Sequence, residues 1–513
     1  MIVTVDDAGA IGVVRDAYAP ELPLNAWSDA RNVRFREGYA EKMRGHASPF
    51  GTPTVAPYHV VPFTTSTARY FVYAGLQKLY YVDTTATHTE ITRASGAYNA
   101  TADARWNGGV FSGIVVLNNG VDAPQYWAGS GLAQPLPAWP DGYTARVLRP
   151  WRSFLLALNI TKSGTNYPHM VKLSHSADPG TLPSSWDHTD PTKDAVERDL
   201  TEDSSPIVDG RSLGDTFVVY KENAYYALVE GGSRIFVSQK ISGAAGALST
   251  NCIAEFPGGH FVMGQGDIFV HSLGAPQSLL TRTMRRWLYG QLDDATYARS
   301  FVAANPLQNE IWACLVPYGQ AFATLALVWN WKDGTFTVRE LPGIAHADFG
   351  VVDSAFSQSW DADAETWDSD TSVWDQLPDI TKSSPRLMMA APAGADLYLA
   401  DQSRLFDGTA ITAYAQREGV SFGDPRRVKL LKRIVPVFEA APGTQIRIRT
   451  GSAMDQSSGT TWGDYQTFTV GTDFEHHCFA SGRYLGWEFS SVSATADWRL
   501  KRFDLHVDQR GAY

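Results

Sequence analysis

The chain has 513 residues, a formal net charge of −11 at pH 7 and a hydrophobic fraction of 44%. That fraction excludes a wholly disordered chain. The acidic balance excludes a general nucleic-acid binder, because phosphate backbones are bound by positively charged surfaces. The length exceeds the usual size of one hydrophobic core, so we expect one large closed architecture and one smaller domain.

Cysteine usage and the N-terminal residues indicate where the chain is made. Cys252, Cys314 and Cys478 are far apart in sequence, and none stands in a CxxC or CxxH spacing. An odd, sparse set argues against a disulfide framework and fits synthesis in a reducing cytoplasm. The first residues include Asp6 and Asp7 and no apolar segment, so we expect no signal peptide.

Short strands joined by tight turns recur along most of the chain. The first is Val33–Arg36, which ends at Glu37-Gly38, and a later hairpin turns at Asp333-Gly334. The segments that show this pattern after the first strand are Arg69–Asp83, Val110–Trp127, Trp151–Asn159, Phe217–Glu230, Asp267–Leu280, Asn309–Pro317, Leu325–Leu341 and Asp396–Gly408.

This recurrence predicts an all-β fold with a β-propeller over residues 51–410. A ring of small antiparallel sheets buries the faces of each sheet against its neighbours and leaves only short edges exposed. Residues 1–50 are expected to be a strand segment that enters the propeller. The number of blades stays open, and a pair of β-sandwiches is the alternative that the same pattern could build.

Two segments depart from the β pattern. Pro276–Ala298 places Leu280, Met284, Trp287 and Leu288 at helical spacing, which predicts a short amphipathic helix in a loop between blades. Ser359–Gln376 is acidic and repeats Trp-Asp every seven residues, which favours a series of turns. The alternative for the second segment is a calcium loop, and its ligands would be Asp361, Asp363, Glu365, Asp368 and Asp370.

Residues 411–513 change in character and predict a separate C-terminal β-sandwich, a platform beside the propeller. Alternating strands are expected at Gln445–Thr450, Tyr465–Val470, Tyr484–Ser490 and Arg499–Val507. A basic cluster precedes them and consists of Arg426, Arg427, Lys429, Lys432 and Arg433. It is either a solvated strand face paired with nearby carboxylates, or a subunit interface or a contact with the phosphate backbone of DNA in a channel.

No motif in the chain predicts catalysis, and we expect no catalytic residues, metal site or cofactor. Gly210–Gly214 reads GxSxG, but a strand follows Ser212 where a nucleophile elbow needs a helix. Glu475–Cys478 offers ligand-type side chains, but too few for a tetrahedral metal site. Asp455–Trp462 resembles the Asp-box turn of sialidases, which is structural.

Several segments, in this order, resemble a family of tail proteins of short-tailed bacteriophages. The family is the tail nozzle, also called tail tubular protein B or packaged-DNA stabilisation protein. The segments that carry the resemblance are Leu22–Lys42, Met284–Tyr318, Leu327–Leu341, the Trp-Asp repeat at Ser359–Asp370, and Glu418–Phe438. Together they cover about a fifth of the chain and are spread along most of its length.

The resemblance implies a structural protein of the virion tail and not an enzyme. Its members form a hexameric ring below the portal and the head-to-tail adaptor, and β-propellers surround a central channel. The ring closes the DNA conduit and passes the genome, without sequence specificity, during ejection at the host envelope. A smaller β domain meets the adaptor and presents sites for fibres or spikes. The alternatives are a propeller glycosidase or depolymerase and a carbohydrate-binding protein.

Overall fold

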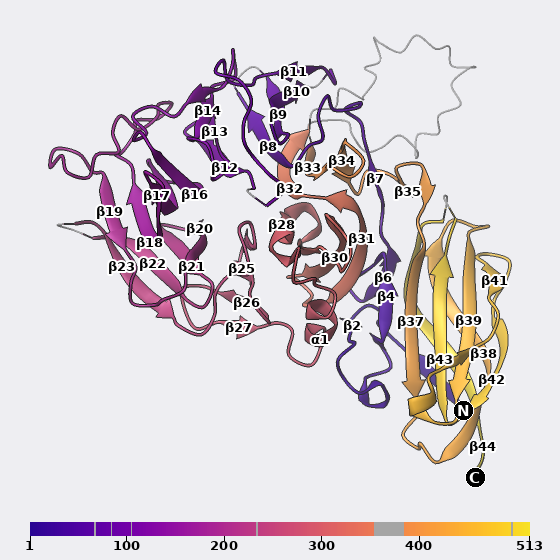
Figure 1. Cartoon of the computed structure of the whole chain (residues 1–513). Coiled ribbons are helices and arrows are strands. Elements are labelled where there is room, and N and C mark those ends of the chain that lie inside the picture. Colours follow the sequence, from indigo (N-terminus) through magenta and orange to yellow (C-terminus); the bar gives the residue numbers. More distant parts are fainter. Residues whose placement is uncertain are drawn as a thin grey trace, which may run out of the picture.

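The computed structural model describes residues 1–512 except 66–67, 84, 104, 232–233, 353–383 and 494–495. Within this part of the chain the strands form nine sheets, of which seven surround a common axis and two pack face to face beside the ring (Figure 1). The predicted all-β propeller fold is therefore confirmed, and the propeller has seven blades. The two sheets beside the ring form the β-sandwich.

The first five blades are four-stranded antiparallel sheets of consecutive strands. Their strands are β8 (His59–Thr64), β9 (Arg69–Ala74), β10 (Leu79–Asp83), β11 (His88–Glu90), β12 (Asn107–Phe111), β13 (Ile114–Asn118), β14 (Gln125–Trp127), β15 (Gln134–Pro135), β16 (Tyr143–Trp151), β17 (Phe154–Lys162), β18 (Thr165–Leu173), β19 (Val196–Asp199), β20 (Ile207–Leu213), β21 (Thr216–Lys221), β22 (Tyr225–Gly231), β23 (Arg234–Ser242), β24 (Ile253–Phe256), β25 (Gly259–Met263), β26 (Ile268–His271) and β27 (Gln277–Ser278).

Blades six and seven include strands from the N-terminal residues. Blade six continues from its fourth strand into two parallel N-terminal strands, and blade seven takes an N-terminal strand as its fourth. The strands of blade six are β28 (Phe301–Asn305), β29 (Glu310–Leu315), β30 (Ala323–Asn330), β31 (Phe336–Ile344), β2 (Gly12–Val13) and β3 (Ala26–Trp27). Those of blade seven are β32 (His346–Val352), β33 (Ser384–Ala391), β34 (Asp396–Ala400), β7 (His46–Ala47), β35 (Leu405–Phe406) and β36 (Thr409–Ala410).

The ring closes because the innermost strand of each blade contacts that of the next, and β32 of blade seven contacts β8 of blade one. Among the described residues a buried apolar cluster lies between each pair of neighbouring blades. At the closure, Val60 and Phe71 of blade one pack with Met388 and Leu397 of blade seven. Burial of these faces against each other supplies the main stabilisation of the ring.

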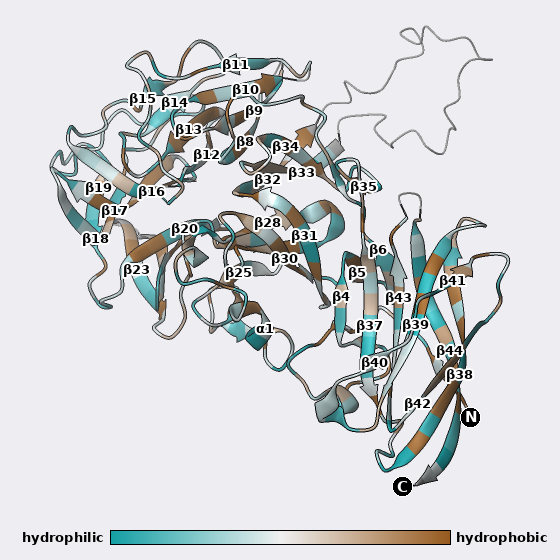
Figure 2. Cartoon of the chain, turned by 45° about the vertical axis from the view of Figure 1, so that its right-hand side comes forward, coloured by the Kyte–Doolittle hydropathy of each residue, from teal (hydrophilic) through white to brown (hydrophobic). Residues whose placement is uncertain are grey.

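The sandwich packs two sheets around a core that is continuous with the apolar cluster between blades five and six. Trp487 and Phe503 face each other across it, with ring centroids 5.8 Å apart. Figure 2 shows the alternation of apolar and polar residues along its strands, as expected for sheets with one buried face. The strands are β1 (Ile2–Val5), β4 (Asp29–Arg31), β5 (Val33–Arg36), β6 (Tyr39–Lys42), β37 (Ala413–Val420), β38 (Arg427–Ala440), β39 (Gln445–Ala453), β40 (Thr461–Trp462), β41 (Gln466–Thr469), β42 (His476–Gly482), β43 (Tyr484–Ser491) and β44 (Trp498–Ala512).

The N-terminal residues differ from the expectation that residues 1–50 are a segment entering the propeller. Strands β2, β3 and β7 do join blades, but β1, β5 and β6 belong to the same sheet as β44, and β4 pairs with β37. The sandwich therefore consists of residues 411–513 together with N-terminal strands. The pattern of a single strand cannot reveal this, because the partner of an edge is chosen by tertiary contacts.

The predicted short helix at Pro276–Ala298 is confirmed only over five residues. The segment begins with β27, the last strand of blade five, and its only α-helix is α1 (Arg285–Tyr289), followed by a 3₁₀ turn at Tyr297–Arg299. Its apolar residues do reach the core, since Leu280, Met284 and Leu288 are buried. The other irregular segment, the Trp-Asp repeat with its calcium hypothesis, lies outside the described residues. No helix among the described residues has the length and hydrophobicity that crossing a membrane requires.

Candidate functional site

The inner strands of all seven blades line a polar cavity of about 310 Å³ on the axis of the propeller. The lining includes His59 of β8, Arg149 of β16, Arg211 of β20 and Asp348 of β32. Charged and imidazole side chains in one enclosed space are a usual sign of a functional or a structurally locked site. The contacts that these groups make decide between the two.

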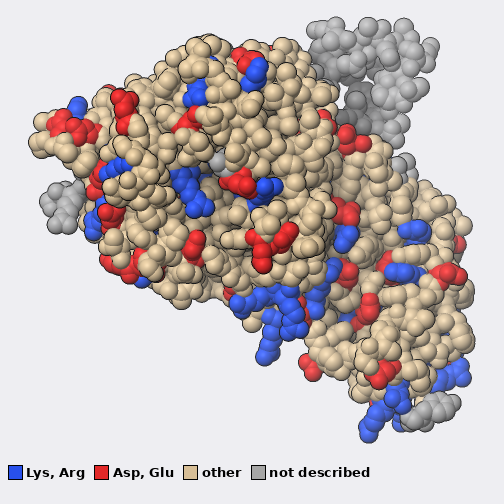
Figure 3. Space-filling view, in the orientation of Figure 1, with Lys and Arg blue, Asp and Glu red and all other residues tan. Residues whose placement is uncertain are grey.

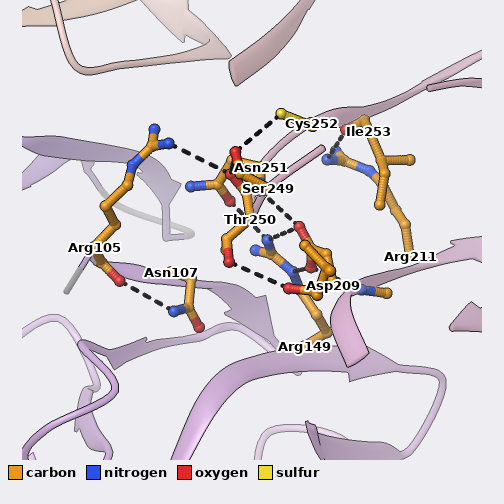
Figure 4. A network of polar contacts seen from close by, with 12 residues as sticks. Arg105, Asn107, Arg149, Asp209, Arg211, Ser249, Thr250, Asn251, Cys252 and Ile253 are labelled. Atoms are coloured by element: carbon orange, nitrogen blue, oxygen red, sulfur yellow. Dashed lines mark hydrogen bonds and ion pairs between the residues drawn. The ribbon is translucent and has the colours of Figure 1, made fainter. Parts of the chain in front are cut away.

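Arg149 lines this cavity, which we also call the propeller channel, and forms an ion pair with Asp209. Its Nε and Nη2 each donate to the carboxylate of Asp209 at 2.9 Å, and Nη2 also donates to Oδ1 of Asn251 at 2.7 Å (Figure 4). The same carboxylate accepts the backbone N–H groups of Asn251 and Gly210, both at 2.7 Å. Bidentate pairs of this kind are strong and directional. The cluster therefore ties blades three and four to the strand that begins blade five.

Arg105 links neighbouring blades through backbone carbonyl oxygens, and no described carboxylate pairs with it. Its guanidinium donates to the carbonyl oxygens of Ala298 and Ser300 at 3.2 Å, of Ala345 at 3.0 Å and of Thr250 at 3.4 Å. These carbonyls belong to the segments that lead into blades five, six and seven. Burial lowers the pKa of Arg105. Figure 4 shows Arg105, Arg149 and Arg211 placed around the segment of residues 249–253.

The pKa values of the other titratable groups in the channel are shifted from their usual values. Burial lowers the pKa of His59 to about 3 and lowers the pKa of His346 well below its usual value. Their rings lie 3.9 Å apart between centroids. Burial also raises the pKa of Asp348 and lowers the pKa of Arg211. At neutral pH both imidazoles are uncharged, so the charge of the channel is carried by arginines and carboxylates.

This chemistry favours a structural role for the channel. Arg149 and Asp209 form an ion pair with each other, and Arg105 donates its hydrogen bonds to backbone carbonyl oxygens. Ser212 lies in strand β20 paired to β21, so it has no nucleophile elbow, as the sequence indicated. The cavity has the volume of a small-molecule site and cannot pass duplex DNA, whose major groove alone is about 12 Å wide.

The predicted basic cluster is not one surface. Arg426 is 90% exposed and Arg427 is 53% exposed, and both lie near Asp424 at 3.8 and 3.4 Å. Lys429 is buried, and its ammonium donates to the carbonyl oxygens of Asp424 and Arg483. Burial lowers the pKa of Lys429. These three residues therefore belong to two environments. The pairing of β38 with β44 shifts register between Arg427 and Lys429, so the regular alternation of side chains is interrupted there.

The remaining two residues of the cluster are in ion pairs. Lys432 contacts Asp508, and Arg433 contacts Glu475 at 2.9 Å. From the sequence, charge reversal at Arg426, Arg427 and Lys429 together would be expected to impair assembly and to leave the fold intact. The burial of Lys429 argues against an intact fold, because a carboxylate at its position would face the carbonyl oxygens of Asp424 and Arg483 that its ammonium now satisfies.

The other two motifs are local structure. In β42, His476 is buried, His477 is exposed and lies 3.2 Å from Glu475, and Cys478 is half-buried. Within the described ranges no group of three or more His, Cys, Asp or Glu side chains could hold a metal ion. In the Asp-box-like turn, Asp455 caps a 3₁₀ turn by accepting the N–H of Ser457 at 3.0 Å.

The sequence did not single out the charged residues of the cavity wall or of the polar network behind it. Arg105, Arg149, Asp209 and Arg211 stand on three different blades or blade connections, so no spacing along the chain links them. What these residues share is their position: each is a polar residue on, or just before, the innermost strand of a blade. That feature becomes readable only when the innermost strands are known.

Comparisons with known proteins concern the fold alone. The sequence matches no protein-family model and no curated protein sequence. Among solved structures, the β-propeller domain of Cps50 (Swd1) from Myceliophteria thermophila covers 69% of this chain and 99% of its own, with 10% identity and a TM-score of 0.40. PorZ, a surface component of the type-IX secretion system of Porphyromonas gingivalis, covers 73% of this chain and 43% of its own, with 10% identity and a TM-score of 0.33. A gluconolactonase from Xanthomonas campestris covers 71% of this chain and 89% of its own, with 12% identity and a TM-score of 0.31.

Proposed function

We propose that this chain is a non-catalytic structural subunit of the tail nozzle of a short-tailed bacteriophage. It would assemble as a homohexamer at the distal end of the tail, below the head-to-tail adaptor, and carry fibres or spikes. The ring would close the DNA conduit before infection and let the genome leave during ejection. The protein would be made in the host cytoplasm and function in the virion.

One observation carries the proposal: the separate segments that resemble the nozzle family meet in space. Leu22–Lys42 contacts each of the other three described segments. Its Arg34 forms a buried ion pair with Glu310, in Met284–Tyr318. Its Asn32 donates to Glu340, in Leu327–Leu341, at 2.9 Å.

The fourth described segment closes the group, since Ser28 accepts the N–H of Glu418 at 3.0 Å. All four segments therefore lie at the junction between blade six and the sandwich (Figure 1). Residues that pack together are constrained together, so a resemblance shared by this junction supports a common architecture more strongly than scattered matches would. The support for the proposal is therefore the buried junction that joins the propeller to the sandwich.

The narrow propeller channel bears on how such a ring would work. Duplex DNA does not fit in a 310 Å³ cavity, whose wall includes Arg149 in its ion pair with Asp209. In a hexamer the conduit would therefore lie between subunits, on the axis of the ring. The net charge of −11 suits that arrangement, because an acidic wall does not retain the phosphate backbone.

Electron microscopy with no imposed symmetry tests the proposal. The sample is the purified phage tail, or this chain co-expressed with its neighbouring tail proteins. A six-fold ring at the distal end of the tail, with the propellers around an axial opening, is the expected result. A trimer that projects sideways and hydrolyses polysaccharide would replace the proposal with a depolymerase spike. A monomer with no tail association would remove the proposed function and leave the fold.

A further inference from the structure

We infer that the loop and helix at Arg282–Arg286 form a contact site for the phosphate backbone of duplex DNA. The site consists of Arg282, Arg285 and Arg286, and we call it the α1 arginine site. It lies after the last strand of blade five, within and just before α1. The choice of DNA as the anion rests on the proposed function; the location of the site rests on the structure.

The first argument is charge without compensation. All three arginines are exposed, and within the described part of the chain none has a carboxylate within ion-pair distance. Figure 3 shows blue side chains gathered where Figure 1 places α1. In contrast, Lys432 and Arg433 of the predicted cluster are each paired with a carboxylate. Unpaired guanidinium groups keep their donors available for phosphate oxygens.

The second argument is that the nearby carboxylates are already used or lie below the surface. Asp16 accepts the backbone N–H groups of Arg286 at 2.6 Å and Trp287 at 3.3 Å, which fixes the start of α1. Asp267 has a buried oxygen next to Gly266, whose carbonyl accepts Nε of Arg285. The guanidinium carbon of Arg15 lies 4.7 Å from the centroid of the Trp287 ring, and this contact holds the helix against the N-terminal segment. The arginines therefore project from a supported backbone.

The third argument distinguishes a nucleic acid from an acidic protein. The exposed neighbours of the site on the preceding strand and turn are Gln277, Ser278 and Thr281, which are polar. No large apolar side chain is exposed among the described residues 277–290. Protein interfaces are usually centred on aromatic or aliphatic anchors. Phosphate contacts instead use arginines together with small polar side chains.

The physical magnitude of such a site is modest. Each phosphate neutralised by an arginine contributes about 0.9 to the slope of log K against log salt, so three contacts predict a slope of about −2.7. The overall charge of −11 opposes binding, so the contact should be weak and detectable only at low ionic strength. A weak contact also fits a conduit through which the genome has to move.

Binding of the full chain to a fluorescein-labelled 24-base-pair duplex of random sequence, followed by anisotropy at several salt concentrations, tests the site. The variant is Arg282→Gln with Arg285→Gln and Arg286→Gln. A second variant keeps Arg285, whose Nε bonds the loop, and changes only the other two. The matched control removes the same number of exposed arginines from the sandwich, as Arg426→Gln, Arg427→Gln and Arg510→Gln. Circular dichroism checks that every variant is folded.

The expected result is at least a tenfold loss of affinity at low salt for the triple α1 variant, a smaller loss for the double, and less than a twofold change for the control. The salt slope of the triple variant should become shallower by about three units. Equal losses in the control, no binding by the unmodified chain, or stronger competition by polyglutamate than by DNA would each overturn the inference. A chain that binds DNA through this site but never enters a tail would instead refute the proposed function alone.

Discussion

The buried ion network that joins the sandwich to the propeller should govern the stability of the chain. Arg34 of β5, in the sandwich, pairs with Glu310 of blade six and with Asp401 of blade seven, the latter at 3.1 Å. Arg339 of blade six donates to the other oxygen of Asp401 at 2.8 Å. All four side chains are buried. The substitution Asp401→Asn keeps the volume and removes the charge that both arginines share.

The expected cost follows from the charge balance. In the variant, two buried guanidinium groups are left with Glu310 as their only carboxylate in the network. The oxygen of the new amide faces one guanidinium, and its NH2 group faces the other. Breaking a buried pair by removing one partner costs about 3 to 5 kcal/mol, because the remaining charge is uncompensated. We expect a loss of unfolding free energy in that range, measured by urea denaturation. Tryptophan fluorescence reports it, since Arg339 lies 4.4 Å from the ring of Trp312.

The control is Asp103→Asn, which removes the carboxylate of an exposed pair. Asp103 contacts Arg299 at 2.7 Å, but its side chain is 72% exposed. Surface pairs contribute about 0 to 1 kcal/mol, so this variant should unfold close to the unmodified chain. Losses of the same size in both variants, or a loss below about 1 kcal/mol for Asp401→Asn, would show that the network does not hold the two parts together.

Four further outcomes are expected. Burial raises the pKa of Asp401, but Arg34 and Arg339 together lower it to about 2. The stabilisation from this carboxylate is therefore present above pH 4 and is lost as pH falls towards 2. Urea denaturation at several pH values should show that the unfolding free energy of Asp401→Asn falls less steeply below pH 4 than that of the unmodified chain. Arg105→Met removes the donor to several part-buried carbonyl oxygens and should lower the unfolding free energy by about 1 to 3 kcal/mol in total. Gly108→Ala places a Cβ 2.0 Å from the carbonyl oxygen of Val116 at a φ of +134°, and should yield little soluble protein. Arg426→Glu with Arg427→Glu should leave the melting temperature within about 2 °C, and tail incorporation then tests the interface hypothesis without a folding defect.

The sequence was sufficient for the hairpins, because apolar alternation and turn residues are local. The predicted strand Val33–Arg36 and the turn at Asp333-Gly334 fall where the structure has them. The helix prediction failed at Gln277–Ser278, where pairing with β26 outweighs the helical spacing of the apolar residues. Leu280 and Leu288 satisfy helical spacing and burial alike, so periodicity could not separate the two.

The site was less accessible to sequence reasoning than the fold. Lys429 and Arg426 are three residues apart and look alike in sequence, but one is buried and the other is 90% exposed. Conversely, Arg105 and Arg149 look unrelated and converge on the segment that begins blade five. Charge alone does not reveal burial, and burial decides whether a cation is a structural donor or a free contact.

The continuity of the core makes the junction the mechanically important part of the molecule. The apolar cluster between blades five and six runs into the sandwich through Trp27, whose indole N–H donates to the carbonyl of Ala8 at 2.6 Å. Beside it, Arg34 crosses from the sandwich to two blades. A force applied to the sandwich is therefore transmitted to the ring through buried contacts and not through a linker. In a nozzle, an adaptor bound to the sandwich would then move the propeller as one body, and opening of the conduit would require subunits to shift against each other rather than blades to separate.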